Sequence, residues 1–263
     1  MSNYLLMKNK NALVCGSTDG IGKAIALLLA ERGVEVILVA RNEEKLLSTL
    51  NELNINFGQK HRFICVDFDN TSSLQEAVHN QIENYKKPIH ILINNSGGPH
   101  GGPLIEAKEA EFRIAFERLL ICNHILAKAV VPLMKDIKFG RIINIISTSV
   151  KQVIRGLGVS NTIRGSVAQW AKTLALELGE FGITVNNILP GYTKTNRLNE
   201  LALKNADNEN VNVEEIFNVW ASNNSVNRLG DAKEIAESVA FLASDSSGFI
   251  NGHNLVIDGG RFR

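Results

Sequence analysis

Seven residues near the start of the chain have the composition of a phosphate-binding loop. The segment Gly16-Ser17-Thr18-Asp19-Gly20-Ile21-Gly22 follows a short apolar run and leads into a helical pattern. Glycines allow a tight turn there, and their missing side chains let backbone N–H groups and the helix N-terminus approach a pyrophosphate. A strand before the glycines and a helix after them make such a motif specific. The sequence therefore predicts a dinucleotide site at this loop.

The end of the second apolar run indicates which dinucleotide is bound. An NAD-binding chain places an acid there to bond the ribose 2′-hydroxyl. This chain instead reads Val39-Ala40-Arg41-Asn42, with no acid before Glu43. A carboxylate would repel a 2′-phosphate, whereas the planar guanidinium of Arg41 can pair with one. The sequence favours NADP(H) over NAD(H); the alternative is that Arg41 stacks on the adenine or lies in solvent.

Seven apolar segments alternate with helical patterns and must position these residues. The segments span residues 12–15, 34–40, 62–66, 89–93, 141–146, 183–189 and 254–258. Near-continuous apolar strands indicate a sheet covered on both faces, and strand–helix alternation indicates parallel pairing with right-handed crossovers. We expect a single doubly wound α/β domain of the Rossmann type over residues 1–263, with a mostly parallel seven-stranded sheet. Helices are predicted at 43–53, 73–84, 108–134 and 161–178.

Composition excludes several classes of function. The 263 residues are 44% hydrophobic and 21% charged, and the net charge is +1. This balance gives no general attraction to nucleic acid or to an anionic membrane, and no apolar run approaches the roughly 18 residues of a membrane helix. The start of the chain does not resemble a signal peptide. We expect a cytoplasmic protein that acts on a small molecule.

The cysteines and histidines give no sign of a metal site. Cys15, Cys65 and Cys122 have no Cys-x-x-Cys spacing and lie within apolar segments, which predicts buried, reduced thiols. The histidines also lack ligand spacing, so no metal is expected.

The two long helices predicted at 108–134 and 161–178 are apolar on more than one side. The second presents Val167, Trp170, Ala171, Leu174 and Leu178. One apolar stripe would pack on the sheet, and a second suggests a partner subunit. We therefore expect a homo-oligomer, a tetramer or a dimer, with a thick core as the alternative.

The Gly-x-x-x-Gly-x-Gly spacing resembles that of the short-chain dehydrogenase/reductase family, and the resemblance continues along nearly the whole chain. Further motifs appear in the family's order: Asp67-Phe68, Asn94-Asn95-Ser96-Gly97, Asn123, Ser147, Pro190-Gly191-Tyr192-Thr193-Lys194-Thr195, Arg228-Leu229-Gly230 and Asp258-Gly259-Gly260. The resemblance implies an oxidoreductase acting on a carbonyl or secondary alcohol, such as a 3-oxoacyl thioester. It also implies that Ser147 orients the substrate carbonyl and that Asn123 has a structural and catalytic role. The implied cofactor contacts are Asp67, Phe68, Asn95, Ser96, Gly97, Pro190, Gly191, Thr193 and Thr195.

The chain departs from the family at the proton donor. In the family a tyrosine protonates the substrate carbonyl, and a lysine four residues later binds the nicotinamide ribose. Counting from Ser147, the chain has Ser160 and Arg164 at these positions, and the run over 165–178 supports that register. A serine is shorter and much less acidic than tyrosine; a guanidinium keeps the charge and can bind ribose, but does not pass a proton. This pattern resembles a subgroup related to 3-oxoacyl carrier-protein reductases.

Other residues are candidates for the missing acid. Tyr192 follows the sixth strand, His100 lies in a glycine-rich loop, and Lys151 lies after Ser147. Each is also explained as a loop or pocket residue, and a water held by Ser160 and Ser147 is a fourth candidate. Tyr4 and Lys8 match Tyr-x-x-x-Lys, but they precede the first strand, at the wrong end of the sheet.

Two functions follow from this pattern. The leading hypothesis is an NADP(H)-dependent oxidoreductase with a non-standard proton donor, because Asn123, Ser147 and the cofactor motifs are intact. Losing a positioned acid typically costs about 10²–10⁴ in rate. The alternative is an NADP(H)-binding protein of little or no turnover that acts as a sensor or assembly partner.

Overall fold

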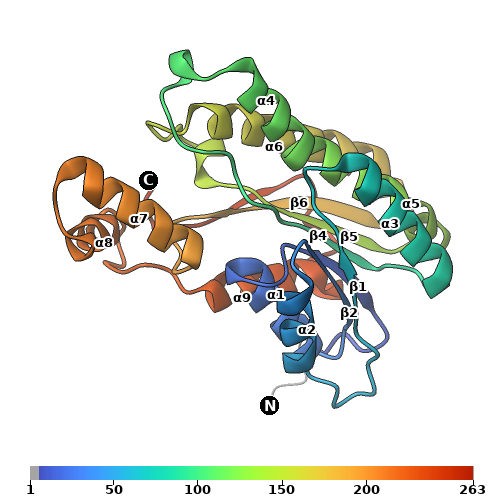
Figure 1. The fold of residues 1–263 in the computed structure, drawn as a ribbon. Helices are drawn as coiled ribbons and strands as arrows, with labels where there is room; N and C mark the ends of the chain where they lie inside the picture. Colours follow the sequence, from blue (N-terminus) through green and yellow to red (C-terminus); the bar gives the residue numbers. More distant parts are fainter. Residues whose placement is uncertain (1–5, 263) are drawn as a thin grey trace.

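Seven parallel strands form one sheet in the computed structural model, which describes residues 6–262 (Figure 1). The strand order is β3-β2-β1-β4-β5-β6-β7. The order reverses between β1 and β4, and in such sheets ligands bind outside the carboxyl ends of the strands at that point. The predicted fold class is confirmed, and all seven predicted strands are present: β1 Asn11–Cys15, β2 Glu35–Ala40, β3 Arg62–Cys65, β4 Ile91–Asn94, β5 Gly140–Ile145, β6 Ile183–Pro190 and β7 Asn254–Ile257.

Helices cover both faces of the sheet, as Figure 1 shows. One face carries α1 Gly20–Glu31, α2 Glu43–Glu52 and α9 Ala232–Ala243. The other face carries α3 Thr71–Tyr85, α5 Cys122–Asp136 and α6 Gly158–Leu178. Successive strand residues point to opposite faces, so Val14 and Leu13 enter different core clusters.

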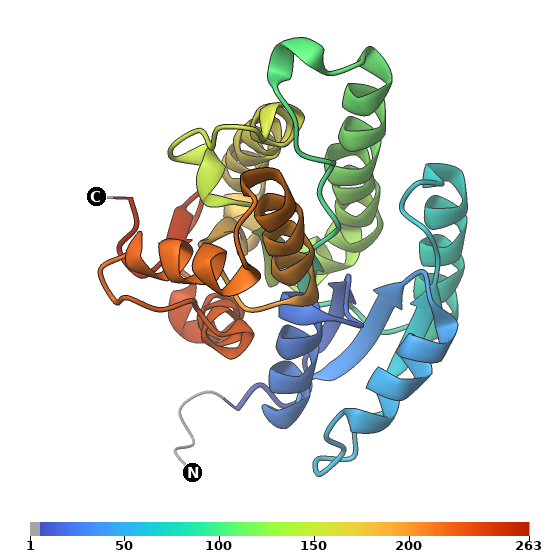
Figure 2. The ribbon, with the colours of Figure 1, turned by 60° about the vertical axis from the view of Figure 1, so that its left-hand side comes forward.

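Two further helices form a small lobe beyond the carboxyl end of β6. They are α7 Asn196–Glu209 and α8 Val213–Ser222, joined by an apolar cluster that includes Leu198, Ala202 and Trp220. Figure 2 shows both helices in orange beside the red C-terminal segment. The lobe therefore borders the end of the sheet at which ligands of this fold bind.

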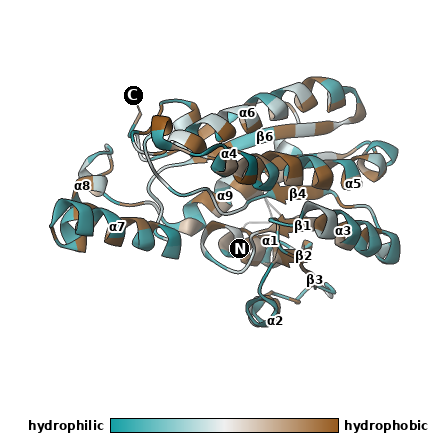
Figure 3. Ribbon diagram, turned by 45° about the horizontal axis from the view of Figure 1, so that its top comes forward, coloured by the Kyte–Doolittle hydropathy of each residue, from teal (hydrophilic) through white to brown (hydrophobic). Residues whose placement is uncertain are grey.

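Four asparagines form a ladder across four strands of the sheet at one register level. Asn94 donates to Asn144, Asn144 to Asn187 and Asn187 to Asn254, each through Nδ2 to Oδ1 at 2.8 Å. In Figure 3 the strands around them are mostly brown, the hydrophobic end of the scale. Buried amides need such partners. The ladder therefore fixes the relative register of β4 to β7 close to the ends from which the site is built.

The helix predicted over 108–134 is interrupted, so that prediction is wrong in its middle. The chain forms α4 Glu109–Phe116, then a π-helical turn at Glu117–Ile121, then α5. The Cys122 N–H donates to the Glu117 carbonyl, which is the i to i+5 bond of a π turn. The extra residue rotates the side chains that follow, and it places Asn123 in the first turn of α5 with its side chain buried.

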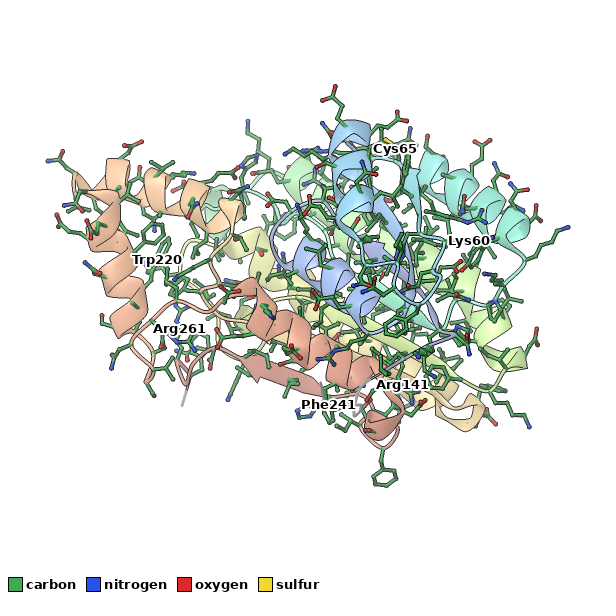
Figure 4. All side chains as sticks on the ribbon, turned by 90° about the horizontal axis from the view of Figure 1, so that it is seen from below. Lys60, Cys65, Arg141, Trp220, Phe241 and Arg261 are labelled. Atoms are coloured by element: carbon green, nitrogen blue, oxygen red, sulfur yellow. The ribbon has the colours of Figure 1, made fainter. Side chains whose placement is uncertain are left out.

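Cys65 corrects the prediction of three buried thiols. Cys15 and Cys122 are buried, and desolvation raises the pKa of both thiols. Cys65 is exposed at the end of β3, which is an edge strand of the sheet. Figure 4 shows it at the periphery of the molecule. Within residues 6–262, no helix has both the length and the apolar character required to cross a membrane.

Candidate active site

A cleft of about 430 Å³ opens at the carboxyl ends of the central strands. The segments that follow β1, β4, β5 and β6 line it, together with residues from α6 and α7. This volume suits a small molecule or part of a cofactor. The predicted site residues that it brings together are Gly16, Gly20, Ile21, Asn95, Ser96, Gly97, Ser147, Ser160, Arg164, Pro190, Gly191 and Thr195.

The glycine loop forms one end of the cleft and has no room for side chains. Gly16 has a φ of +58°, and a Cβ there would lie 2.6 Å from Asn95 Nδ2. A Cβ on Gly22 would lie 2.0 Å from the Gly16 carbonyl oxygen. Asn95 Nδ2 also donates to the carbonyls of Cys15 and Gly16, at 3.2 and 3.3 Å. The bare backbone at the start of α1 fits a pyrophosphate, and any side chain would change its shape.

Ser147 lies after β5 with its hydroxyl oriented by the backbone. Its Oγ accepts a hydrogen bond from the Ser149 N–H at 3.1 Å, in a short turn at Thr148–Val150. A hydroxyl has one hydrogen to donate in addition to its lone pairs. Ser147 Oγ lines the cleft and keeps its hydrogen when it accepts this bond, so it can also donate to an oxygen in the cleft.

Arg164 is held by its own helix and by the strand end beside it. Nε donates to Ser160 Oγ at 3.2 Å, and Nη1 donates to the Ile146 carbonyl at 2.8 Å. Nη2 lies against the loop after β4, where a Cβ on Gly98 would be 2.9 Å from it. Burial and, next, the charge of Arg197 lower the pKa of Arg164 to about 10. Arg164 therefore still carries its charge at neutral pH.

A small polar cavity lies behind Arg164. It measures about 10 Å³, close to the size of one water molecule, and is lined in part by Asn94, Ser96, Asn123 and Arg164. Asn94 Oδ1 is buried and has no hydrogen-bond partner among residues 6–262. The structure thus brings Asn123 and Arg164 to the wall of one small cavity.

The nominated substitute acids lie outside the cleft. Tyr192 is stacked on Trp220, with ring centroids 4.7 Å apart, and the Arg261 guanidinium lies 4.1 Å from its ring centre. Figure 4 shows Trp220 and Arg261 in the same lobe. Tyr192 therefore packs in that lobe and does not line the cleft, and its nomination as a catalytic acid stays a prediction. His100 and Lys151 are exposed, and neither lines the cleft. Tyr4 lies outside the described residues.

Several predicted cofactor residues are also not part of the cleft wall. Arg41 is exposed at the end of β2, and its Nη1 lies 3.6 Å from Asp67 Oδ2. Phe68 is buried in the core, and Thr193 is buried with its hydroxyl donating to the Gly191 carbonyl. The predicted residues that do not line the cleft are Ser17, Thr18, Gly22, Arg41, Asp67, Phe68, Asn123, Tyr192 and Thr193.

Arg197 lines the cleft and was missed from the sequence. It lies in the first turn of α7, where Nη1 donates to Glu200 at 3.3 Å and Nη2 to the Pro99 carbonyl at 3.5 Å. Its position in the sequence could have indicated it, because Arg197 comes only two residues after Thr195, the last residue of the Pro190–Thr195 motif. Only the folded chain shows that α7 turns back over the loop after β4.

Comparison with known proteins gives matches over nearly the full length. A family model described as enoyl-(acyl carrier protein) reductase matches residues 16–261. The chain is 34% identical over 258 residues to the 3-oxoacyl-acyl-carrier-protein reductase FabG of Haemophilus influenzae, covering 97% of this chain and 99% of the relative.

Solved structures agree with this result. The L-sorbose reductase of Gluconobacter frateurii, solved with NADPH and L-sorbose, is 26% identical with a TM-score of 0.92, covering 100% of this chain and 99% of that one. A single-substitution variant of the actinorhodin polyketide ketoreductase, solved with NADPH, is 31% identical with a TM-score of 0.89, covering 96% and 97%.

Proposed function

The chain belongs to the short-chain dehydrogenase/reductase family of oxidoreductases, and from that premise we propose that it interconverts a carbonyl compound and its alcohol with NADP(H). When bound, the cofactor supplies a hydride to the carbonyl carbon, while a proton adds to the oxygen. One observation carries the proposal: the glycine loop, Ser147 and Arg164 line a single cleft. Two reductases of the same fold, both solved with NADPH, support the choice of cofactor.

Different residues of the chain would bind the cofactor and the substrate. The bare backbone of Gly16, Gly20 and Gly22 would hold the pyrophosphate at the start of α1. Arg164 would hold the nicotinamide ribose, and Ser147 would donate its hydroxyl hydrogen to the substrate oxygen. The further cofactor contacts proposed are the loops after β4 and β6, which include Asn95, Ser96, Gly97, Pro190, Gly191 and Thr195.

The proton would come from water rather than from a side chain of the usual kind. Among residues 6–262, no Tyr, His or Lys lines the cleft. Ser160 is too weak an acid to protonate a carbonyl oxygen alone, and the charged Arg164 keeps its protons. A water bound between the hydroxyls of Ser160 and Ser147 is therefore the proposed donor.

A broad substrate screen tests the activity. NADPH oxidation is measured against ketones, aldehydes and 3-oxoacyl thioesters, and we expect turnover of at least one class. The competing proposal is a cofactor-binding protein that acts as a sensor or assembly partner, which the missing acid favours. Tight NADPH binding without turnover of any compound would support that second function.

Arg41 is proposed to select NADP(H) over NAD(H). Arg41→Ala is expected to weaken NADPH binding about tenfold, the low end for a charge-assisted hydrogen bond at an exposed site, and to leave NADH affinity unchanged. Calorimetric titration of both cofactors measures this, and Lys45→Ala removes a neighbouring charge as the control. Equal wild-type affinity for the two cofactors would refute the assignment.

We also propose a cytoplasmic homo-oligomer, a dimer or a tetramer. Large apolar side chains remain exposed on the helices expected to form the interface: Ile114 at 54% and Phe116 at 40% on α4, and Leu176 at 82% on α6. Such side chains are buried when a partner covers them. Light scattering at micromolar concentration is expected to give a multiple of 28.9 kDa. A mass equal to one chain would rule out the assembly.

A further inference from the structure

Two arginines on different helices meet at one loop of the cleft. Arg164, from α6, places Nη2 against Gly98. Arg197, from α7, donates through Nη2 to the carbonyl of Pro99, the next residue along. Both arginines line the cleft. Guanidinium groups from two helices therefore contact the loop after β4.

Little negative charge faces this pair. The one acid that lines the cleft within residues 6–262 is Asp19, the N-cap of α1. Asp19 accepts hydrogen bonds from the Gly20 N–H at 2.7 Å and from Asn196 Nδ2 at 2.9 Å. Glu200 pairs with Arg197 at 3.3 Å on the exposed side of α7 and does not line the cleft. Because like charges repel, two arginines at one loop favour an anion between them.

The cofactor does not account for this positive charge. Its pyrophosphate fits the glycine loop at the start of α1, and its 2′-phosphate is assigned to Arg41. The nicotinamide ribose proposed for Arg164 is neutral, so it leaves the charge of that residue uncompensated. The remaining ligand of the cleft is the substrate.

We propose that Arg197 and Arg164 form an anion subsite, so that the substrate is a carbonyl compound that also carries a carboxylate. The inference rests on the proposed function and names its substrate class. A planar guanidinium fork matches the two oxygens of a carboxylate. Arg197 is exposed, and both of its polar contacts are long, at 3.3 Å to Glu200 and 3.5 Å to the Pro99 carbonyl, so this residue can turn toward such a group.

Matched pairs of ligands test the subsite. Pyruvate and 2-oxo-4-phenylbutanoate are compared with their methyl esters, and dihydroxyacetone phosphate supplies a phosphate arm. Binding to the apo and NADPH-loaded protein is measured by calorimetry, and turnover by NADPH oxidation. The variants are Arg197→Met, Arg197→Lys and, as a control outside the cleft, Arg155→Met.

We expect the wild-type protein to bind the acids at least about tenfold more tightly than the esters, the effect of a charge-assisted hydrogen bond. Arg197→Met should abolish this preference for acids. Its dissociation constant for NADPH should stay within about twofold of the wild-type value. Arg197→Lys should retain part of it because the charge remains without the fork. Arg155→Met should behave as wild type.

Three outcomes would overturn the subsite. Equal binding of acids and esters would show that no carboxylate is recognised, and tighter binding of dihydroxyacetone phosphate than of the acids would show that the anion is a phosphate. If Arg197→Met weakened NADPH binding and left the preference for acids unchanged, Arg197 would be assigned to the cofactor. Failure of the reductase proposal looks different, because the acids would then bind in preference to the esters without any NADPH oxidation.

Discussion

Gly22→Ala is expected to lower NADPH affinity by at least about 100-fold, or about 2.7 kcal/mol. The new Cβ would lie 2.0 Å from the Gly16 carbonyl oxygen, a distance at which backbone has to move. The strands and helix that hold the loop are buried and do not adjust easily. Displacing Gly16 also disturbs the contact between Asn95 and the loop, so the backbone groups proposed for the pyrophosphate lose their arrangement.

Gly165→Ala is the matched control for this change. Position 165 lies within α6, and a Cβ there meets nothing within 4 Å. Alanine in a helix interior is favoured over glycine by roughly 1 kcal/mol, so this variant should be slightly more stable and bind NADPH normally. Calorimetry gives the affinity, and thermal unfolding shows whether Gly22→Ala is folded. A folded Gly22→Ala protein with wild-type NADPH affinity would place the cofactor elsewhere.

Ser147→Ala and Arg164→Ala are expected to act on different quantities, the first on the rate of hydride transfer and the second on the affinity for NADPH. Ser147→Ala should slow hydride transfer by about 10²–10³, the usual effect of removing one donor to a developing oxyanion, and leave NADPH affinity unchanged. Arg164→Ala should weaken NADPH binding by roughly 1.5–3 kcal/mol, because it removes a charged donor proposed for the ribose. Stopped-flow single-turnover measurements separate the rate from the affinity.

Ser149→Ala controls for Ser147→Ala. The Ser149 hydroxyl is buried without a hydrogen-bond partner among residues 6–262, whereas its backbone N–H holds Ser147. Its removal should therefore leave the rate unchanged. If Arg164→Ala left NADPH affinity at the wild-type value, the ribose contact would have to be reassigned to another residue.

The fold and the glycine loop were predictable because they depend on local pattern. Residues 36–40 of β2, for example, are apolar throughout, which is the pattern of a strand covered on both faces. Gly16 and Gly22 are required by backbone geometry, which the motif spacing encodes directly. Ser147 was found through the family resemblance and Ser160 by counting from it, with the run over 165–178 supporting the register, and the fold brings both to the same cleft.

The remaining parts depend on contacts between residues far apart in the chain. Tyr192 was nominated from its position after β6, but its ring packs on Trp220, in a helix that the sequence reading did not place. Arg197 gains its position only when α7 folds back toward Pro99. The π turn before Cys122 depends on one backbone hydrogen bond, which apolar periodicity does not reveal.

The most direct test of the account is transfer of deuterium from NADPH labelled at the reactive C4 position. The labelled cofactor is incubated with the protein and with each carbonyl compound of the substrate screen, and the alcohol products are analysed by mass spectrometry. We predict deuterium at the former carbonyl carbon of at least one product, and a loss of that label in proportion to the slowed rate with Ser147→Ala. NADPH bound tightly, with no deuterium in any product, would contradict the assignment as a working reductase.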